Sequence, residues 1–392
     1  MQPRSVEDYR GLAARRLPAF MFEYVDSGSC AEVTMRRNRD SLNALALRQR
    51  VLRDVSEIDT STELFGTRWA LPFALSPVGM AGMLARRGEV QAARAAREAA
   101  VPFTLSSASV CPLEEVAAGT GSPFWFQLYM LNDRGYMQEL LQRARTAGCC
   151  ALLVTVDTPV LGTRYRDFRA GISNDPWPVR AARLAGQVAT KPAWAWHVGL
   201  HGRPHMLGNM AAAVEAGSPL AAVAGWMQSS LAASLGWKDL EWIRDRWSGP
   251  LLLKGLLDAE DVRMAAASPI DGLVVSNHGG RQLDGAMATA EVLPGIVDAV
   301  GGRFPVLVDG GVRSGADILR MLALGASAVM AGRAWAYALA AAGGAGVERL
   351  LQLISQELRI AMALAGVTRI ADIGPDCLGG FSRTHETQGR TI

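Results

Sequence analysis

Short apolar runs alternate with helical segments along most of the chain, and this alternation constrains the fold more than any other feature. Eight of the runs have the apolar, β-prone composition of buried strands. The segments between them are rich in Ala, Arg, Glu and Leu and therefore predict helices. Strands that alternate with helices form parallel sheets, and eight such units favour a closed (β/α)8 TIM barrel, an α/β fold, over an open sheet. The predicted strands are residues 72–77, 102–105, 125–129, 151–156, 251–254, 272–276, 305–308 and 326–330, and the clearest predicted helices are residues 87–99, 134–147, 259–267 and 313–324.

Length and composition agree with one large barrel. The chain has 392 residues, of which 49% are hydrophobic and 20% charged, as in ordinary globular proteins. α/β barrels commonly exceed 250 residues as a single unit. We therefore predict a single domain over residues 1–392, with a helical segment before the first strand.

One connection breaks the alternation. After the fourth predicted strand, residues 159–236 pass before the next strand–helix unit begins. A structureless loop of that length is improbable inside a compact domain, so we expect a functional excursion: a lid, a partner surface or a membrane patch. Residues 176–214 of this excursion contain no acid and carry four cationic side chains, Arg180, Arg183, Lys191 and Arg203.

The excursion is also rich in tryptophan. Trp177, Trp194, Trp196 and Trp226 lie in or just after its basic part. Tryptophan together with Lys and Arg is typical of an interfacial anchor on anionic lipid. A solvated lid whose tryptophans pack on the barrel would have the same composition, so both interpretations stay open. Residues 216–237 are free of charge, but their Gly, Pro and Ser content disfavours a spanning helix.

Several classes of protein and site are disfavoured. Forty basic and 37 acidic residues give a net charge of only +3, too balanced for a nucleic-acid-binding protein. The five cysteines form no CxxC pair, which disfavours a disulfide framework or a zinc ribbon and fits a reducing compartment. The first 30 residues lack the apolar core of a secretory signal. His197, His201 and His205 recur every four residues, but glycines and a proline interrupt that helix, so no metal site is expected.

The carboxyl ends of the predicted strands carry the residues with chemical potential. Active sites of such barrels lie at these ends. At any single position a structural role is the more economical explanation, but a set that contains His, Lys, Tyr and Asp favours an active site. The residues are Gly79, Ser106, Gln127, Tyr129, Thr155, Asp157, Lys254, Ser276, His278, Asp309, Gly332 and Arg333.

The segment that follows the sixth predicted strand is the most informative. His278 and Arg281 are separated by two glycines, which allow close approach of the backbone to a bound group. A histidine can act as a general base and an arginine can hold a carboxylate with two hydrogen bonds, so the pair suits proton abstraction beside a carboxylate. Asp157 could orient the imidazole. A structural His278, and a salt bridge between Asp157 and Arg164, are the alternatives.

Two glycine-rich segments near the end of the barrel indicate a phosphate site. Residues 308–315 read VDGGVRSG, and residues 331–333 read AGR. Many barrels bind phosphate after strands seven and eight through backbone amides. Neither a P-loop nor a GxGxxG motif is present in the sequence.

Taken together, these motifs resemble the FMN-dependent L-2-hydroxyacid oxidase and dehydrogenase family. The resemblance rests on SNHGGRQLDG at 276–285, FQLY at 126–129, TVD at 155–157 and DGGVRSG at 309–315, and it extends from Tyr24 to about residue 365. Isopentenyl-diphosphate isomerases and other FMN barrels share parts of the first motif. The segments PVGMAGMLARRGEVQAA, PFTLSSASVCPLEEVA and GLHGRPHMLGN are most similar to the bacterial membrane-associated, quinone-reducing L-lactate dehydrogenases of this family.

The resemblance implies a role for each candidate residue. His278 would be the base, Asp157 its partner, and Arg281 with Tyr24 the grip on the substrate carboxylate. Tyr129 would bind the substrate hydroxyl, with Arg164 as a second cationic neighbour. Lys254 would stabilise the anionic reduced flavin. The residues implied to bind FMN are Pro77, Val78, Gly79, Ser106, Gln127, Thr155, Lys254, Ser276, Asp309, Gly310, Gly311, Arg313, Gly332 and Arg333.

The resemblance further implies oxidation of an L-2-hydroxyacid, with L-lactate and pyruvate as substrate and product and membrane quinone as acceptor. A peripheral protein on the cytoplasmic side of the inner membrane, assembled as a homo-oligomer (a tetramer in the family), is expected. Gly79 favours a dehydrogenase, because oxidases of the family often carry Ala there. The alternatives are a soluble oxidase that produces H₂O₂, a mandelate or glycolate dehydrogenase, an FMN-dependent isomerase and a non-catalytic scaffold. Val110 and Leu161 are plausible pocket walls but do not separate these substrates.

Overall fold

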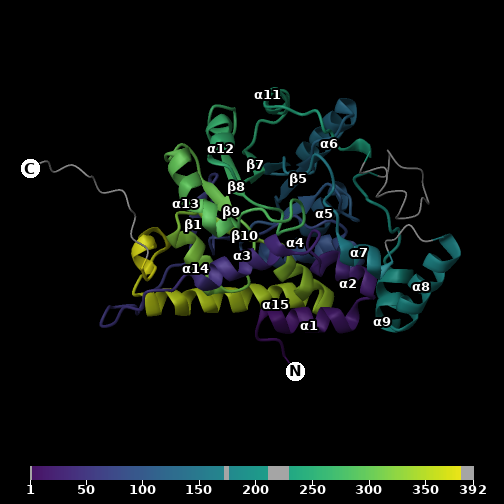
Figure 1. Cartoon of the computed structure of the whole chain (residues 1–392), viewed down its shortest axis with the longest axis horizontal. Helices are drawn as coiled ribbons and strands as arrows, with labels where there is room; N and C mark the ends of the chain where they lie inside the picture. Colours follow the sequence, from purple (N-terminus) through teal and green to yellow (C-terminus); the bar gives the residue numbers. More distant parts are fainter. Residues whose placement is uncertain (1, 172–175, 211–228, 381–392) are drawn as a thin grey trace, which may run out of the picture.

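The computed structural model describes residues 2–171, 176–210 and 229–380 (Figure 1). Eight parallel strands lie side by side in chain order, except that the last strand, β10, pairs with the first, β3. A parallel bridge between Leu75 and Phe103 joins β3 to β4 and completes the ring. The predicted (β/α)8 barrel is therefore confirmed, and both ends of every predicted strand lie within two residues of the observed ends. The strands are β3 Phe73–Leu75, β4 Thr104–Ser106, β5 Trp125–Tyr129, β6 Ala151–Thr155, β7 Leu251–Leu256, β8 Gly272–Val275, β9 Val306–Val308 and β10 Ala328–Ala331.

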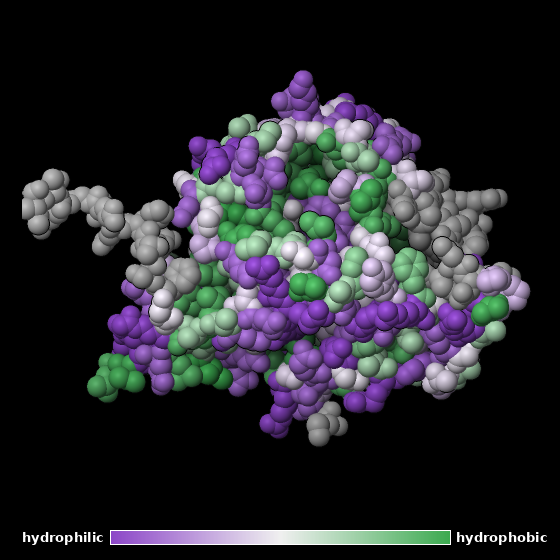
Figure 2. Space-filling model, viewed as in Figure 1, coloured by the Kyte–Doolittle hydropathy of each residue, from purple (hydrophilic) through white to green (hydrophobic). Residues whose placement is uncertain are grey.

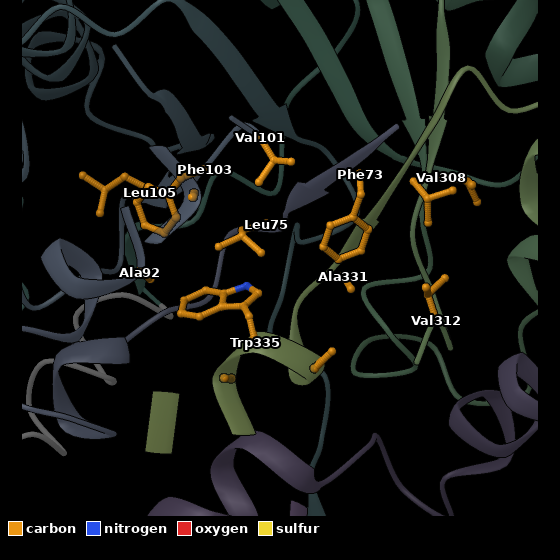
Figure 3. Packing of buried hydrophobic residues seen from close by; sticks show 14 of the residues in the cluster. Phe73, Leu75, Ala92, Val101, Phe103, Leu105, Val308, Val312, Ala331 and Trp335 are labelled. Carbon is orange, nitrogen blue, oxygen red and sulfur yellow. The ribbon is translucent and has the colours of Figure 1, made fainter. Parts of the chain in front are cut away.

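Apolar residues cover both faces of the barrel wall, because successive strand side chains point to opposite sides. In β7, for example, Leu252 packs in the cluster inside the barrel, while Leu251 and Leu253 pack against the surrounding helices. Figure 3 shows the outer packing, where Trp335 lies beside Leu75 and Phe103. The Trp335 indole also donates a hydrogen bond to the Ser76 carbonyl (3.0 Å), which ties the last helix to the first strand of the barrel.

A small antiparallel hairpin closes the amino end of the barrel and was not predicted. Its strands are β1 Thr62–Leu64 and β2 Thr67–Trp69. The Trp69 ring lies 5.5 Å from that of Trp125, at the base of β5. With three polar-rich residues in each strand, the hairpin has too short a pattern for sequence periodicity to reveal.

Helices surround the barrel, and the four predicted helices are observed within two residues of their expected ends. Before the barrel come three further helices, which confirm the predicted helical segment, and α1 packs along the long last helix, α15 (Figure 1). The helices are α1 Val6–Arg16, α2 Ala19–Asp26, α3 Val33–Ala44, α4 Gly88–Glu98, α5 Leu113–Thr120, α6 Arg134–Thr146, α11 Lys238–Arg244, α12 Ala259–Ala266, α13 Thr289–Val300, α14 Gly315–Ala323 and α15 Arg333–Ala365.

The excursion between β6 and β7 contains its own helices, as its length led us to expect. They are α7 Tyr165–Ala170, α8 Trp177–Ala189, α9 Pro192–Trp194 and the π-helical turn η2 Ala195–Leu200. None of the helices in the described ranges is both long and apolar enough to cross a membrane. Trp226 and most of the apolar run 216–237 lie outside the described residues.

The tryptophans of the excursion differ in their surroundings. Trp194 is buried, donates its indole N–H to the Met83 carbonyl (2.8 Å) and packs edge-on against Phe20. The interfacial interpretation is therefore wrong for Trp194, which anchors the excursion to the barrel. Trp196, by contrast, is 58% exposed. Of the three spaced histidines, His201 and His205 each bond a backbone carbonyl, those of Trp196 and Val198.

Candidate active site

A tight turn after β8 presents His278 to the centre of the barrel mouth. His278, Gly279 and Gly280 all have left-handed backbone conformations, with φ of 56°, 65° and 74°. The two glycines are required by close approach as well as by conformation. A β-carbon at Gly279 would lie 2.8 Å from Nη1 of Arg333, and one at Gly280 would lie 2.5 Å from the Met35 amide nitrogen. The turn is closed by a hydrogen bond from the His278 amide to Oγ of Ser276 (3.0 Å).

The imidazole of His278 meets the carboxylate of Asp157. Nδ1 of His278 lies 3.0 Å from Oδ1 of Asp157, which follows β6. In this arrangement Nδ1 donates and Nε2 is left as the basic nitrogen. The alternative salt bridge between Asp157 and Arg164 is not formed, because Arg164 instead pairs with Asp167 at 3.6 Å.

The pKa of Asp157 is set by opposing effects. Burial raises it, but the charge and the hydrogen bond of His278 and the charge of Lys254 outweigh burial and lower it. Asp157 is thus an anion at neutral pH and can stabilise a protonated imidazole. Gly255, at φ 117°, makes room for it, since a β-carbon there would lie 2.6 Å from that of Asp157.

Two tyrosines and two arginines gather beside this pair. The guanidinium of Arg281 lies 5.2 Å from the centre of the Tyr24 ring, and the Tyr24 hydroxyl donates to the Gly79 carbonyl (3.2 Å). Burial raises the pKa of both Tyr24 and Tyr129, so both phenols stay neutral. Asp157, Arg164 and Arg281 all lie close enough to Tyr129 for their charges to affect its pKa.

Arg281 sits among like charges. Burial, together with Arg164 and Arg333, lowers the pKa of Arg281 to about 9, so its guanidinium is still charged at neutral pH. It donates Nη1 to the Ser27 carbonyl (2.9 Å). A buried cation that is repelled by two others favours an anionic ligand, such as a carboxylate.

A line of buried polar side chains crosses three strand ends. Oγ of Ser106 donates to Oε1 of Gln127 (3.0 Å), and Nε2 of Gln127 donates to Oγ1 of Thr155 (3.0 Å). These side chains come from β4, β5 and β6. Ordered donors and acceptors on an otherwise apolar barrel can form hydrogen bonds with the polar edge of a planar ring.

Lys254 joins two further strand ends. Its ammonium donates to Oγ of Ser276 (2.7 Å) and lies 2.9 Å from Oδ2 of Asp309, and the side chain is almost wholly buried. Oδ1 of Asp309 is buried and lacks a hydrogen-bond partner among the described residues. An unsatisfied buried acceptor beside a buried cation indicates that a ligand group completes this part of the site.

In the glycine-rich segments the backbone lies very close to neighbouring elements. A β-carbon at Gly310 would lie 2.6 Å from Oγ1 of Thr289, and one at Gly311 would lie 2.6 Å from the Asn38 carbonyl. Gly332, at the end of β10, is followed directly by α15. The first barrel strand ends nearby, since a β-carbon at Gly332 would lie 3.4 Å from Cγ2 of Val78.

Positive charge accumulates beside these glycine-rich segments. Arg313 bonds the Val312 carbonyl, whereas Arg333 bonds the carbonyls of Val25, Ser27 and Gly279. In the part of the chain that the structure describes, neither arginine has a carboxylate within ion-pair distance. Burial lowers the pKa of Arg313, which again favours an anion beside it. Two half-buried arginines next to glycines match the needs of a phosphate.

The remaining predicted residues line the segment after β3. Pro77, Val78 and Gly79 connect that strand to the short 3-10 helix η1 Ala81–Met83. A β-carbon at Gly79 would lie only 2.8 Å from the Tyr24 hydroxyl. The structure therefore brings all the predicted site residues to one end of the barrel.

Sequence reasoning missed three contributions, all involving the N-terminal segment or the excursion. Asn38 of α3 exchanges hydrogen bonds with Asn277 (both 2.8 Å), which fixes the turn before His278. The Ser27 carbonyl holds two arginines, and Asp167 holds Ser27. A backbone carbonyl leaves no trace in the sequence, and Asn38 could have been suspected only as an isolated polar residue on the buried side of a helix.

Comparison with known proteins places these features in a family. The model of the FMN-dependent dehydrogenase family matches residues 13–379. An L-lactate dehydrogenase of Caulobacter vibrioides (strain NA1000 / CB15N) is 58% identical over 374 residues, covering 95% of this chain and 97% of that protein. An L-lactate dehydrogenase of Stenotrophomonas maltophilia (strain R551-3) is 55% identical over 371 residues, with the same coverage.

Two solved structures are similar over nearly their whole length. One is the monotopic membrane protein (S)-mandelate dehydrogenase, with a TM-score of 0.90 and 37% identity over 97% of this chain and 100% of that one. The other is a mandelate oxidase with (S)-4-hydroxymandelic acid, with a TM-score of 0.83 and 39% identity over 96% of this chain and 98% of that one.

Proposed function

The chain belongs to the FMN-dependent dehydrogenase family, and from that premise we propose that it oxidises L-lactate to pyruvate and passes the electrons to membrane quinone. The observation that carries the proposal is the Asp157–His278 pair, with Nδ1 and Oδ1 3.0 Å apart, next to Arg281. A base, a carboxylate grip and a flavin site are the three parts that oxidation of a 2-hydroxyacid requires. Family membership sets aside the isomerase and the non-catalytic scaffold.

The proton is handled by His278 in this proposal. Its Nε2 removes a proton from the substrate, and Asp157 stabilises the resulting imidazolium. Bound FMN would supply the acceptor for the two electrons and the second proton that the substrate loses in becoming pyruvate. The neutral Tyr129 hydroxyl binds the substrate oxygen, which keeps the reacting carbon in line with the base.

The substrate carboxylate is held by cations. Arg281 offers a planar pair of donors, and the Tyr24 hydroxyl, which donates to the Gly79 carbonyl in the structure (3.2 Å), would turn to the substrate carboxylate. Arg164 supplies a second positive charge nearby, since its charge acts to lower the pKa of both Tyr129 and Arg281. This grip orients the substrate and contributes binding energy in the ground state and the transition state.

The residues present suit FMN. We propose that the phosphate is held by backbone amides of Gly310, Gly311 and Gly332 with Arg313 and Arg333, and that the free oxygen of Asp309 accepts a ribityl hydroxyl. The ring would then lie against residues 77–79, with its polar edge on Ser106, Gln127, Thr155, Lys254 and Ser276. Lys254, buried and positive, would favour the reduced flavin, which gains negative charge.

We propose L-lactate as the substrate because relatives that are 58% and 55% identical to this chain carry the name L-lactate dehydrogenase. Mandelate and glycolate remain alternative substrates, since the solved relatives act on the former. Val110 is buried and fixed through a hydrogen bond from its amide to Glu89 (2.9 Å), whereas Leu161 is partly exposed. One fixed and one adjustable wall would suit a small side chain on the substrate.

We further propose peripheral attachment to the cytoplasmic face of the inner membrane, as a homo-oligomer. A monotopic membrane protein shares the fold. The excursion exposes Val179, Trp196 and Leu200 (52%, 58% and 51%), and Figure 2 shows apolar and hydrophilic side chains side by side at the α8 end of the molecule. Exposed apolar residues among cations are typical of a segment that lies in the interface of an anionic membrane.

Steady-state turnover with a panel of acids and acceptors tests the proposal. L-Lactate should give the largest kcat/KM among L-lactate, L-mandelate and glycolate, and membranes containing quinone should support faster turnover than dissolved O₂. A larger kcat/KM for L-mandelate or glycolate would show that L-lactate is not the preferred substrate. Rapid O₂ consumption with stoichiometric H₂O₂, and no advantage from membranes, would replace the dehydrogenase by the soluble oxidase.

A further inference from the structure

We propose that Ser27 and Asp167 are positioning residues for the substrate-carboxylate grip: Asp167, in the excursion, fixes Ser27, whose carbonyl holds Arg281 in place. This inference rests on the proposed function, because it takes Arg281 as the group that binds the substrate carboxylate. It adds Asp167, a residue of the excursion, to the residues that shape the site.

The Ser27 carbonyl is a shared acceptor for two cations. Ser27 follows the last residue of α2 and is fully buried. Its oxygen accepts Nη1 of Arg281 at 2.9 Å and Nη2 of Arg333 at 2.7 Å. Because a carbonyl oxygen has two lone pairs, these two bonds saturate it. The position of one backbone oxygen thus decides where the Arg281 guanidinium lies.

The side chain of Ser27 is held in turn by Asp167. Oγ of Ser27 donates to Oδ1 of Asp167 at 2.6 Å, which is the short distance expected for a hydroxyl bonded to a carboxylate. The other carboxylate oxygen, Oδ2, lies 3.6 Å from Nη1 of Arg164. Asp167 is buried, in the middle of α7. One carboxylate therefore contacts Arg164 directly and reaches Arg281 through a single residue.

Other contacts keep α7 in place when this bond is removed. Arg166, the preceding residue, lies 2.7 Å from Asp26 and 3.2 Å from Glu32, and it also pairs with Glu23. The pairs with Glu23 and Asp26 join α7 to α2, and the pair with Glu32 joins it to the start of α3, all independently of Ser27. Loss of the Ser27–Asp167 bond should therefore release the Ser27 carbonyl locally, without detaching the excursion.

Ser29 provides a matched control. It is as buried as Ser27, lies two residues away, and its hydroxyl also bonds the excursion, at the Thr163 carbonyl (3.1 Å). Its own carbonyl accepts the Glu32 amide rather than an arginine. A general loosening of this contact would act through both serines, whereas displacement of the carbonyl that accepts from the Arg281 guanidinium would act only through Ser27.

The test compares Ser27→Ala, Asp167→Ala, Asp167→Asn, the double alanine variant and Ser29→Ala as FMN-loaded enzymes. We measure kcat and KM for L-lactate, and the dissociation constant of the unreactive carboxylate oxalate from the change in flavin absorbance. In Ser27→Ala and Asp167→Ala, KM and the oxalate constant should both rise about tenfold, with kcat within about threefold, because coupled groups in one network typically lose that much. FMN content should hold, since Arg333 keeps its bonds to Val25 and Gly279.

Two further results discriminate positioning from simple destabilisation. The double variant should be no worse than the weaker-binding single variant, because both changes break the same bond. Asp167→Asn, whose amide oxygen can still accept the Ser27 hydroxyl, should lose less affinity than Asp167→Ala. Ser29→Ala should leave KM and oxalate binding unchanged whatever its effect on Tm.

Three outcomes would overturn the inference: unchanged oxalate binding in Ser27→Ala and Asp167→Ala, additive losses in the double variant, or an equal loss in Ser29→Ala. Wild-type enzyme and Arg281→Lys separate this from failure of the proposed function. If wild type does not oxidise L-lactate, or Arg281→Lys binds oxalate normally, the proposed function fails. If both behave as proposed and the Ser27 variants are silent, only the positioning role fails.

Discussion

His278 occupies a backbone conformation that costs energy for a residue with a β-carbon, and the surrounding structure explains why it is kept there. Its φ of 56° aims the imidazole at Asp157, and the following glycines let Arg333 and α3 approach the turn. A shift of the turn by one residue would lose the pairing. The chemistry of the site therefore depends on backbone geometry as much as on the identity of the histidine.

Replacing His278 with Gln tests its role as the base. Gln can fill the space and accept a hydrogen bond, but it cannot take up a proton. FMN should stay bound, and reduction of the flavin by L-lactate should slow by about 10²–10⁴-fold in stopped-flow absorbance, which is the usual contribution of a positioned base. A reduction rate close to that of wild type would remove His278 from the reaction.

Arg281→Lys tests the carboxylate grip. Lysine keeps the charge but lacks the planar pair of donors, and it cannot both bond the Ser27 carbonyl and hold a carboxylate with two parallel bonds. KM should rise and flavin reduction should slow together, measured at saturating and subsaturating L-lactate. Unchanged kcat and KM would mean that another group, such as Arg164, holds the carboxylate.

Most of the candidate site could be predicted at this scale because barrel topology brings consecutive strand ends together. Asp157, Lys254 and His278 lie in or just after three separate strands and come together as expected. The contributions of Asn38 and Ser27 could not be predicted, since they come from helices outside the barrel repeat and act through packing or a backbone oxygen. The pairing of Arg164 could not be predicted either, because Asp157 and Asp167 are both near it in sequence.

Among the elements, α2 is the junction between the N-terminal segment, the excursion and α15. Asp26, its last residue, is buried and accepts hydrogen bonds from Arg10, Arg166 and Tyr337, with the Arg166 and Tyr337 bonds both at 2.7 Å. The three partners come from α1, α7 and α15. Asp26 thus holds together the elements that carry Tyr24 and Arg333.

The protonation of Asp26 predicts a pH-dependent stability. Burial raises its pKa, but hydrogen bonds from Arg10, Tyr337 and Arg166 outweigh burial and hold the pKa well below the ordinary range. A pKa lower in the folded than in the unfolded state stabilises the fold above the unfolded carboxyl value, about pH 4, and this stability is lost as the pH falls further. Asp26→Asn should lower the free energy of unfolding by about 3 kcal/mol at neutral pH, because it leaves Arg10 and Arg166 without the carboxylate that they pair with.

Thermal unfolding at several pH values checks this prediction. Tm of Asp26→Asn should lie below that of wild type at pH 7, and the two curves should converge in acid. Asp59, an exposed carboxylate that accepts the Ser61 amide (2.8 Å) and lies 3.9 Å from Arg68, is the control, and Asp59→Asn should lower Tm far less than Asp26→Asn. A constant difference between wild type and Asp26→Asn across the whole pH range would contradict the ion-pair explanation.

The strand and helix pattern of the barrel was predictable because each unit consists of an apolar run of four or more residues followed by a helical segment. The hairpin formed by β1 and β2 was not, since residues such as Thr62 and Arg68 form no apolar run and Trp69 is the one buried residue in its two strands, with Leu64 only partly buried. Within the excursion, Trp194 and Trp196 look alike in sequence. Only tertiary packing on Phe20 and Met83 separates the buried one from the exposed one.

For the molecule as a whole, attachment to membranes is the most testable consequence of the excursion. The full-length protein should sediment with anionic vesicles at low salt, and salt should release it only partly. Cationic residues contribute about 1 kcal/mol each near an anionic surface, which salt screens, whereas buried apolar area is insensitive to salt.

A matched pair of variants localises the contact. Combined Val179→Ala, Trp196→Ala and Leu200→Ala should reduce vesicle binding and turnover with membrane quinone, while turnover with a soluble dye is kept. Ile360→Ala with Leu364→Ala, which removes similarly exposed side chains from α15, should change neither. Wild-type protein that stays in the supernatant at low salt would defeat the membrane proposal and favour the soluble oxidase.

The central claim is that one site on this barrel takes two electrons and two protons from L-lactate, and anaerobic mixing tests it most directly. The purified protein is mixed with L-lactate or D-lactate in the absence of any acceptor, and flavin absorbance and pyruvate are measured. We predict that one equivalent of L-lactate bleaches the flavin and yields one equivalent of pyruvate per site, and that D-lactate leaves the spectrum unchanged. A protein that carries FMN but is not bleached by L-lactate would contradict the account.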